Sequence, residues 1–265
     1  MRSRLKLGLI PFGDDAAARA RVEAFASSLG AALGATVELH KGVDYRAIVA
    51  AMEQGLVDFA WLPPLSAARV VRNGAGVPAA IAVRNASTSY MTGLLSMKTS
   101  AIVSLADLKG VRAAWVDRES ASGYVVIRAA LRASGVSLVS AFAEELFVRS
   151  HAEVARALQT GRADVGATCF NVASGGTVQI ARLPAGQALA HDEVRILAQA
   201  GPIPSDIFAV RIAVAPSTLA TVQAALVDAR PGRAHASAMD LMRADGFVRP
   251  SEAHSRMITS LFDIL

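Results

Sequence analysis

The sequence contains very little cysteine, and this scarcity limits the chemistry open to it. Cys169 is the single cysteine among 265 residues, so the chain forms no intrachain disulfide. With no second thiol and no cluster of His or Asp near it, no metal site of recognisable spacing is present, and we expect neither a metal nor a cofactor. We interpret Cys169 as a small core hydrophobe.

Long apolar runs and a recognisable leader are also missing. No apolar stretch approaches the ~20 residues that a membrane-spanning helix needs, so we do not expect the chain to cross a membrane. Residues 1–4 are too polar to begin a signal peptide, and the apolar run at 5–10 has the length of a strand. If the protein is exported to the periplasm, we expect its leader to be absent from this chain.

Dense basic clusters are absent even though the formal net charge is +5. The basic residues are spread along the chain, and only Arg69 with Arg72, and Arg128 with Arg132, have a spacing that puts two charges on one helix face. We therefore expect no nucleic-acid partner. The positive balance could still help to attract an anionic ligand.

What is present is the composition and pattern of a globular α/β protein. Hydrophobic residues make up 53% of the chain and charged residues 18%, which excludes a disordered chain. Strand-length apolar runs at residues 5–10, 36–40 and 57–60 alternate with helical segments. Asp14 or Asp15, and then Asp44, can cap those helices. This alternation predicts a parallel α/β sheet.

The same pattern begins again after Ser89, which predicts a second lobe. Helix, Gly, two residues and Asp occur twice, at Gly55 to Asp58 and at Gly161 to Asp164, so both lobes use a similar unit. We expect residues 1–90 and 205–265 to form lobe 1 and residues 91–204 to form lobe 2, joined by two crossing strands.

The segment Ser120-Ala121-Ser122-Gly123 carries chemistry that can be argued from its residues alone. It follows a predicted strand at 111–116 and opens a predicted helix at 123–134. Free backbone N–H groups, the helix dipole and two hydroxyls meet there, which predicts an oxyanion site. The alternative is that Ser120 or Ser122 only caps the helix.

Several segments, taken in order, resemble the phosphate/phosphite/phosphonate-binding family of type II periplasmic solute-binding proteins, the substrate-binding components of ABC importers. The resemblance covers nearly the whole chain after about residue 5. It lies in the following segments: Asp44-Tyr45, Val57-Asp58-Phe59-Ala60-Trp61-Leu62-Pro63-Pro64-Leu65, Tyr90, Leu105-Ala106-Asp107-Leu108-Lys109-Gly110, Ser120-Ala121-Ser122-Gly123-Tyr124, Ser150-His151, Ala163-Asp164-Val165-Gly166-Ala167, Gly201-Pro202-Ile203-Pro204-Ser205-Asp206 and Gly246-Phe247-Val248. Their order and spacing are specific, although each motif alone is weak.

The resemblance implies an α/β fold of two lobes with a ligand cleft between them. It implies a protein that captures a small oxyanion of the phosphonate, phosphite or phosphate type by hinge closure and delivers it to the membrane subunits of an ABC importer. Two alternatives stay open, a ligand-sensing domain of a signalling system and an enzyme on the same fold. No Gly-x-Ser-x-Gly or Walker motif supports the enzyme.

The resemblance also implies ligand-contacting residues outside the Ser120 segment. Tyr45 and Tyr90 match its tyrosines, His151 its histidine and Asp206 an aspartate that faces the ligand. A carboxylate accepts hydrogen bonds only from a protonated oxygen or an amine, so Asp206 would favour phosphonate or phosphate monoanions over sulfate. The alternatives are surface or core aromatics for the tyrosines, a helix cap or surface residue for His151 and a turn residue for Asp206.

Trp61 is expected either to line the ligand site or simply to pack, because it ends a strand of the predicted sheet. Two positions depart from the family pattern. Ala121 stands where the family has threonine, so one hydroxyl contact is missing. Asn171 stands seven residues after Asp164, where members that bind amine-bearing phosphonates have a glutamate, which puts 2-aminoethylphosphonate in doubt as a ligand.

Overall fold

The structure is a computed structural model that describes residues 4–10, 15–172, 178–180, 189, 191–214, 216–227 and 232–264. The chain divides into two compact units, and each is described by itself. Unit 1 takes in Met1–Thr88 and Pro204–Phe262, and unit 2 takes in Ser89–Ile203 with the last residues of the chain. Asp14, one of the two residues expected to cap the first helix, lies outside the described residues.

Unit 1 is built on a mixed sheet. Among the described residues its strand order is β12-β4-β11-β3-β1-β2. The strands are β1 (Arg4–Leu9), β2 (Thr36–Lys41), β3 (Phe59–Leu62), β4 (Gly76–Val83), β11 (Ile207–Arg211) and β12 (Gly246–Val248). β1 is parallel to β2 and β3, whereas β11 lies antiparallel between β3 and β4. The late strand β11 therefore completes a sheet begun by the first 83 residues.

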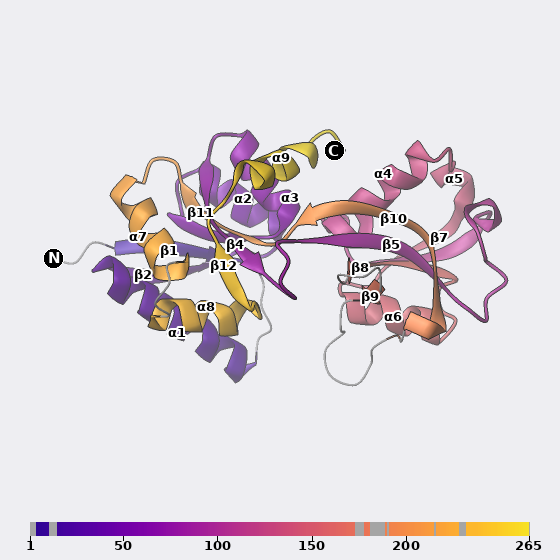
Figure 1. The fold of residues 1–265 in the computed structure, drawn as a ribbon, viewed down its shortest axis with the longest axis horizontal. Helices are drawn as coiled ribbons and strands as arrows, with labels where there is room; N and C mark the ends of the chain where they lie inside the picture. The colour runs from indigo at the N-terminus through magenta and orange to yellow at the C-terminus, as the bar shows by residue number, and fades with distance from the viewer. Residues whose placement is uncertain are drawn as a thin grey trace. The chain divides into compact units, whose positions relative to one another are not determined.

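Helices cover both faces of this sheet (Figure 1). One layer contains α1 (Ala16–Leu33), α7 (Pro216–Val227) and α8 (Arg233–Met242), and the other contains α2 (Tyr45–Glu53), α3 (Pro64–Arg72) and α9 (Glu252–Ser260). Asp15 and Asp44 begin α1 and α2 by accepting hydrogen bonds from the N–H groups of Ala18 and Ala47 at 2.7 and 2.8 Å. These caps satisfy N–H groups that have no partner inside the helix.

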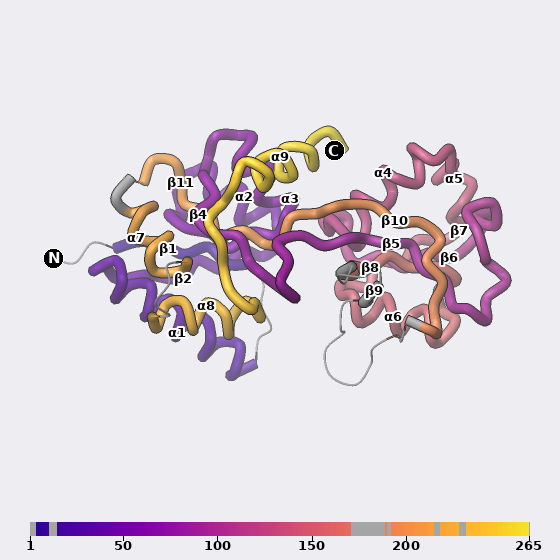
Figure 2. Tube along the Cα trace, in the orientation of Figure 1, coloured from indigo at the N-terminus to yellow at the C-terminus, as the bar shows by residue number. Residues whose placement is uncertain are grey.

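Unit 2 has a second mixed sheet. Its strand order over the described residues is β10-β5-β8-β6-β7, with β9 paired to β8. The strands are β5 (Ser89–Met97), β6 (Val111–Trp115), β7 (Phe142–Phe147), β8 (Val165–Val172), β9 (Val178–Ile180) and β10 (Val194–Pro204). β6 is parallel to β7 and β8, and β5 is antiparallel to β8. Figure 2 shows β10 running beside β5, although about a hundred residues separate them in the sequence.

The helices of unit 2 also lie on both faces of its sheet. They are η1 (Leu105–Asp107), the π-helical turn η2 (Ala121–Val125), α4 (Val126–Ala133), α5 (Leu138–Ala141), α6 (His151–Gln159) and η3 (His191–Glu193). Ile127 and Leu131 of α4 pack with Trp115 and Phe142, whereas Val154 of α6 packs in a separate cluster. The helix expected at 123–134 therefore starts earlier, at Ala121, through a π turn. Among the described residues, no helix has the length and hydrophobicity needed to cross a membrane.

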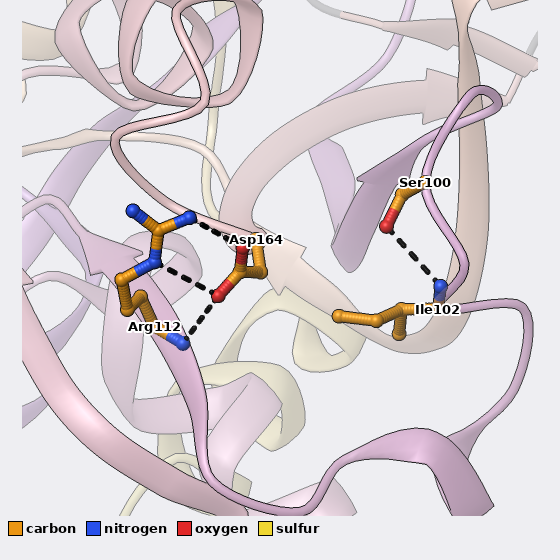
Figure 3. Close-up of polar contacts among 4 residues, drawn as sticks. All are labelled: Ser100, Ile102, Arg112 and Asp164. Atoms are coloured by element: carbon orange, nitrogen blue, oxygen red, sulfur yellow. Dashed lines mark hydrogen bonds and ion pairs between the residues drawn. The ribbon is translucent and has the colours of Figure 1, made fainter.

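The two Gly-x-x-Asp segments make the same backbone hydrogen bonds in the two units. The N–H of Asp58 donates to the carbonyl of Lys6, and its carboxylate accepts the N–H of Lys6 at 3.0 Å. Asp164 makes the matching pair with Arg112 at 2.8 Å and also binds the Arg112 guanidinium (Figure 3). Each aspartate therefore fixes the first residues of two neighbouring parallel strands.

Candidate functional site

Ser120 and the three residues after it form a tight entry into the helix that follows β6. The Ser120 hydroxyl accepts a hydrogen bond from the Gly123 N–H at 3.0 Å, and the Ser120 carbonyl accepts one from the Val125 N–H at 3.0 Å. A Cβ on Gly123 would lie 2.4 Å from the side chain of Val116, closer than atoms approach. Only glycine therefore fits at this position.

The start of this helix leaves hydrogen-bond donors available in a buried place. The N–H groups of Ala121 and Ser122 lie in the first turn, where no carbonyl of the helix can accept them. Ala121 and Ser122 are 6% and 3% exposed. No described residue forms a hydrogen bond with the Ser122 hydroxyl. These donors, at the positive end of a helix, are suited to binding an anion.

Two threonines support this segment from the sheet. The buried Thr92 of β5 donates its hydroxyl to the Ser122 carbonyl at 2.6 Å. Thr168 of β8 lies beside Thr92, since the Thr168 carbonyl is 3.4 Å from the same hydroxyl. With its carbonyl bound to Thr92 and the next N–H bound to Ser120, the Ser122-Gly123 peptide has one fixed orientation.

His151 joins the same group of residues from the start of α6. Ser150 caps that helix by accepting the Glu153 N–H at 3.2 Å, so His151 is its first residue and not its cap. The His151 Nδ1 lies 2.9 Å from the Thr168 hydroxyl. Ser122, Thr92, Thr168 and His151 thus form a continuous polar cluster within unit 2.

Cys169 is partly exposed and interacts electrostatically with His151, so it is not the fully buried small hydrophobe that we expected. Burial lowers the pKa of His151, but the charge of Cys169 and a hydrogen bond to it outweigh burial and raise the pKa above 6.5. Burial raises the pKa of Cys169, yet its attraction to His151 brings it below 9.0. The interaction therefore favours the protonated imidazole of His151, which is a hydrogen-bond donor.

Asp206 lies in unit 1, directly before β11, and has a strong partner. Its Oδ2 accepts a hydrogen bond from a terminal nitrogen of Arg84 at 2.8 Å. The same nitrogen of Arg84 donates to the carbonyl of Met242 at 2.8 Å. Asp206 is therefore one half of an ion pair, a partner that the sequence did not predict.

The aromatic candidates divide between the two units. Tyr90 is half-buried on β5, two residues before Thr92, so both side chains project from the same face of the strand. Tyr45 is the first residue of α2 in unit 1 and is also half-buried. Trp61 is only 2% exposed and packs edge-to-face on Phe247 at 6.3 Å. Its indole packs in the core of unit 1, which is one of the two roles expected for it, and its role as a ligand contact stays a prediction.

A family model described as "ABC transporter, phosphonate, periplasmic substrate-binding protein" matches residues 7–255. The chain belongs to this family. The resemblance that the motifs indicated is thereby confirmed, and the family is one of transport binding proteins rather than enzymes. A small anion ligand, ABC transporter partners and a periplasmic or exported location are what the family implies.

Solved structures show the same fold. A Xanthomonas citri protein bound to ATP has a TM-score of 0.78 at 21% identity, with 98% of this chain and 95% of that chain covered. A binding protein component of an ABC phosphonate transporter from Pseudomonas aeruginosa has a TM-score of 0.72 at 22% identity, covering 99% and 87%. PhnD1 from Prochlorococcus marinus in complex with methylphosphonate has a TM-score of 0.71 at 15% identity, covering 99% of each chain. The expected type II periplasmic-binding-protein fold is confirmed.

Within unit 2, the structure brings several of the family's expected contact residues together. Ser120 to Gly123 and His151 form one cluster in unit 2, with Tyr90 on the adjoining strand, while Tyr45 and Asp206 belong to unit 1. Asn171 lies on β8 opposite Gln179, and its side chain is outside what the structure describes. No group of three or more His, Cys, Asp or Glu within the described ranges could hold a metal ion.

Sequence reasoning missed Arg84, Thr92, Thr168 and the partner of Cys169. The sequence does contain a pattern that could have predicted Thr92 as a site residue, because Thr92 follows Tyr90 by two residues and so lies on the same face of the strand. Arg84 and Asp206 are 122 residues apart, and nothing local pairs them.

Proposed function

We propose that this protein binds a small oxyanion of the phosphonate, phosphite or phosphate type and delivers it to the membrane subunits of an ABC importer. The observation that carries the proposal is the buried segment Ser120 to Gly123. Its free N–H groups and the Ser122 hydroxyl adjoin the Ser122–Gly123 peptide, which Thr92 and Ser120 hold in one orientation. In such a site each hydrogen bond to a charged ligand contributes about 1.5–3 kcal/mol.

The other expected residues complete this proposal. His151 donates a hydrogen bond to the oxyanion, Tyr45 and Tyr90 provide apolar walls with a hydroxyl at the tip, and Asp206 accepts from a protonated ligand oxygen. Asn171 supplies no negative charge for a ligand ammonium group. An aminoalkyl chain on the ligand should therefore increase its affinity little. The protein acts in the periplasm or another exported location.

The first test is a thermal-shift screen followed by calorimetry with methylphosphonate, phosphite, phosphate, sulfate and 2-aminoethylphosphonate. At a hundred times its Kd, a ligand stabilises the folded protein by about 2.7 kcal/mol, which corresponds to a rise in Tm of about 5 °C or more. We expect such a rise for at least one phosphorus oxyanion. Ser140→Ala removes an exposed hydroxyl elsewhere in unit 2, and as the matched control it should show the same rise in Tm as the wild type. Absence of binding for all five would refute the proposal.

We propose further that the chain performs no chemistry on its ligand. Cys169 and His151 have the pairing that activates a thiol nucleophile in some enzymes, so the proposal needs its own test. Methylphosphonate incubated with the protein should be recovered unchanged by phosphorus NMR. Release of phosphate that disappears in Cys169→Ala would instead assign the chain to the enzymes.

A further inference from the structure

Arg84 and Asp206 form an ion pair that is half-buried in unit 1. Arg84 directly follows β4, and Asp206 directly precedes β11, the neighbouring strand. Their side chains are 31% and 26% exposed, and the Nη2 to Oδ2 distance is 2.8 Å. The pairing of β4 with β11 places the two residues together, and the Asp206 carbonyl also accepts the Ala82 N–H at 3.0 Å.

The guanidinium is held in place on its other side by the end of α8. Its Nη2 donates to the Met242 carbonyl at 2.8 Å, and its Nε donates to the Arg243 carbonyl at 3.3 Å. These carbonyls end a helix, where the negative end of the dipole favours a cation. Arg84 is therefore held by three hydrogen bonds and cannot easily rotate away from Asp206.

The pair still has a hydrogen-bond acceptor and a hydrogen-bond donor that a ligand can use. Within the described part of the chain, nothing donates to the Oδ1 of Asp206, and nothing accepts from the Nη1 of Arg84. One group is an acceptor and the other a charged donor. A lone carboxylate would repel every fully ionised oxyanion, whereas this pair is close to neutral and offers a donor beside the acceptor.

We propose that Arg84 is a specificity-determining residue that widens the range of ligands to fully ionised oxyanions, with sulfonates as the chemical class. This inference rests on the proposed function, in which Asp206 contacts the ligand. Asp206 favours a ligand oxygen that carries a proton, and Arg84 limits that preference by neutralising the carboxylate and by donating to an ionised oxygen. Removal of Arg84 restores the full repulsion between the Asp206 carboxylate and a fully ionised ligand.

The test compares methylphosphonate, which retains an ionisable proton, with methanesulfonate, which has none at neutral pH. Calorimetry gives the ratio of the Kd for methanesulfonate to the Kd for methylphosphonate. We expect Arg84→Gln to raise this ratio about tenfold, which equals about 1.4 kcal/mol. Arg84→Lys should keep the ratio near that of the wild type, because the charge beside Asp206 is retained. Arg112→Gln, which removes an arginine–aspartate pair in the sheet of unit 2, is the matched control and should leave the ratio unchanged.

A double-mutant cycle separates this role from a structural one. In an Asp206→Asn background there is no carboxylate to neutralise, so Arg84→Gln should raise the ratio clearly less than it does in the wild type, because only the donor to an ionised oxygen is then lost. Should Arg84→Gln fail to fold, Asp206→Asn alone carries the test and must lower the ratio. A ratio that either substitution leaves unchanged, while wild type binds methylphosphonate, overturns the inference alone. A wild type that binds neither ligand overturns this inference, and the proposed function fails with it only if the ligands of the first test do not bind either.

Discussion

Ser120 and Ser122 show how two identical side chains, two positions apart, acquire different roles. The Ser120 hydroxyl is used by the protein itself, since it accepts the Gly123 N–H at 3.0 Å. The Ser122 carbonyl is bound by Thr92, but its hydroxyl has no partner among the described residues. The two interpretations of this motif, helix cap and anion contact, therefore apply to different serines.

This difference predicts opposite consequences for the two alanine variants. Ser122→Ala should weaken oxyanion binding by about 1.5–3 kcal/mol, the contribution of a hydrogen bond to a charged group, with little change in stability. Ser120→Ala should instead lower the free energy of unfolding by about 1 kcal/mol through loss of the cap. Calorimetry and urea denaturation measure the two effects. Equal losses of affinity in both variants would contradict the division of roles.

At the scale of elements, the two units share one way of starting a pair of parallel strands. Asp58 fixes β1 beside β3, and Asp164 fixes β6 beside β8, each by donating its own N–H to a backbone carbonyl and accepting a backbone N–H with its carboxylate. The local motif is visible in the sequence because helix, glycine and aspartate follow one another within a few residues. The glycines Gly55 and Gly161 adopt positive φ angles of 70° and 67°, as the end of a helix requires.

Asp164→Ala is predicted to destabilise the protein by about 1–3 kcal/mol, because it leaves the backbone N–H of Arg112 without its acceptor. Arg112→Gln keeps that backbone contact and removes only a partly exposed ion pair, so its cost should be about 0–1 kcal/mol. Urea denaturation of the two variants beside the wild type is the measurement. A greater loss in Arg112→Gln than in Asp164→Ala would show that the guanidinium, and not the backbone contact, holds the strands.

At the scale of the whole molecule, unit 1 is assembled from two distant parts of the chain, and side-chain contacts connect them. His254 of α9 is an example. Its Nδ1 accepts the Ser251 N–H at 3.0 Å, which leaves Nε2–H to donate to the Thr88 hydroxyl at 2.8 Å. This arrangement requires a neutral ring, and burial lowers the pKa of His254 below 6.5.

The lowered pKa predicts how stability changes with pH. As pH falls, the unfolded chain takes up the proton first, so the contribution of His254 is present above about pH 6.5 and decreases below it. The raised pKa of His151 acts with the opposite sign. We therefore expect wild type to lose more stability than His254→Gln between about pH 8 and pH 5. Urea denaturation at both values measures this, and parallel losses would show that His254 does not titrate in this range.

The sequence by itself determined the local features of this protein and, through the order of its motifs, its family. Asp15 and Asp44 cap helices through partners three residues away, and such short-range contacts depend on neighbouring residues alone. The tertiary structure decided what long-range pairing brings together. β11 lies between β3 and β4, so Arg84 meets Asp206 across 122 residues, and β5 beside β8 puts Thr92 against Ser122. Burial of both sheet faces determines the strand order, and the strand order determines which distant residues meet. No local sequence pattern indicates that order.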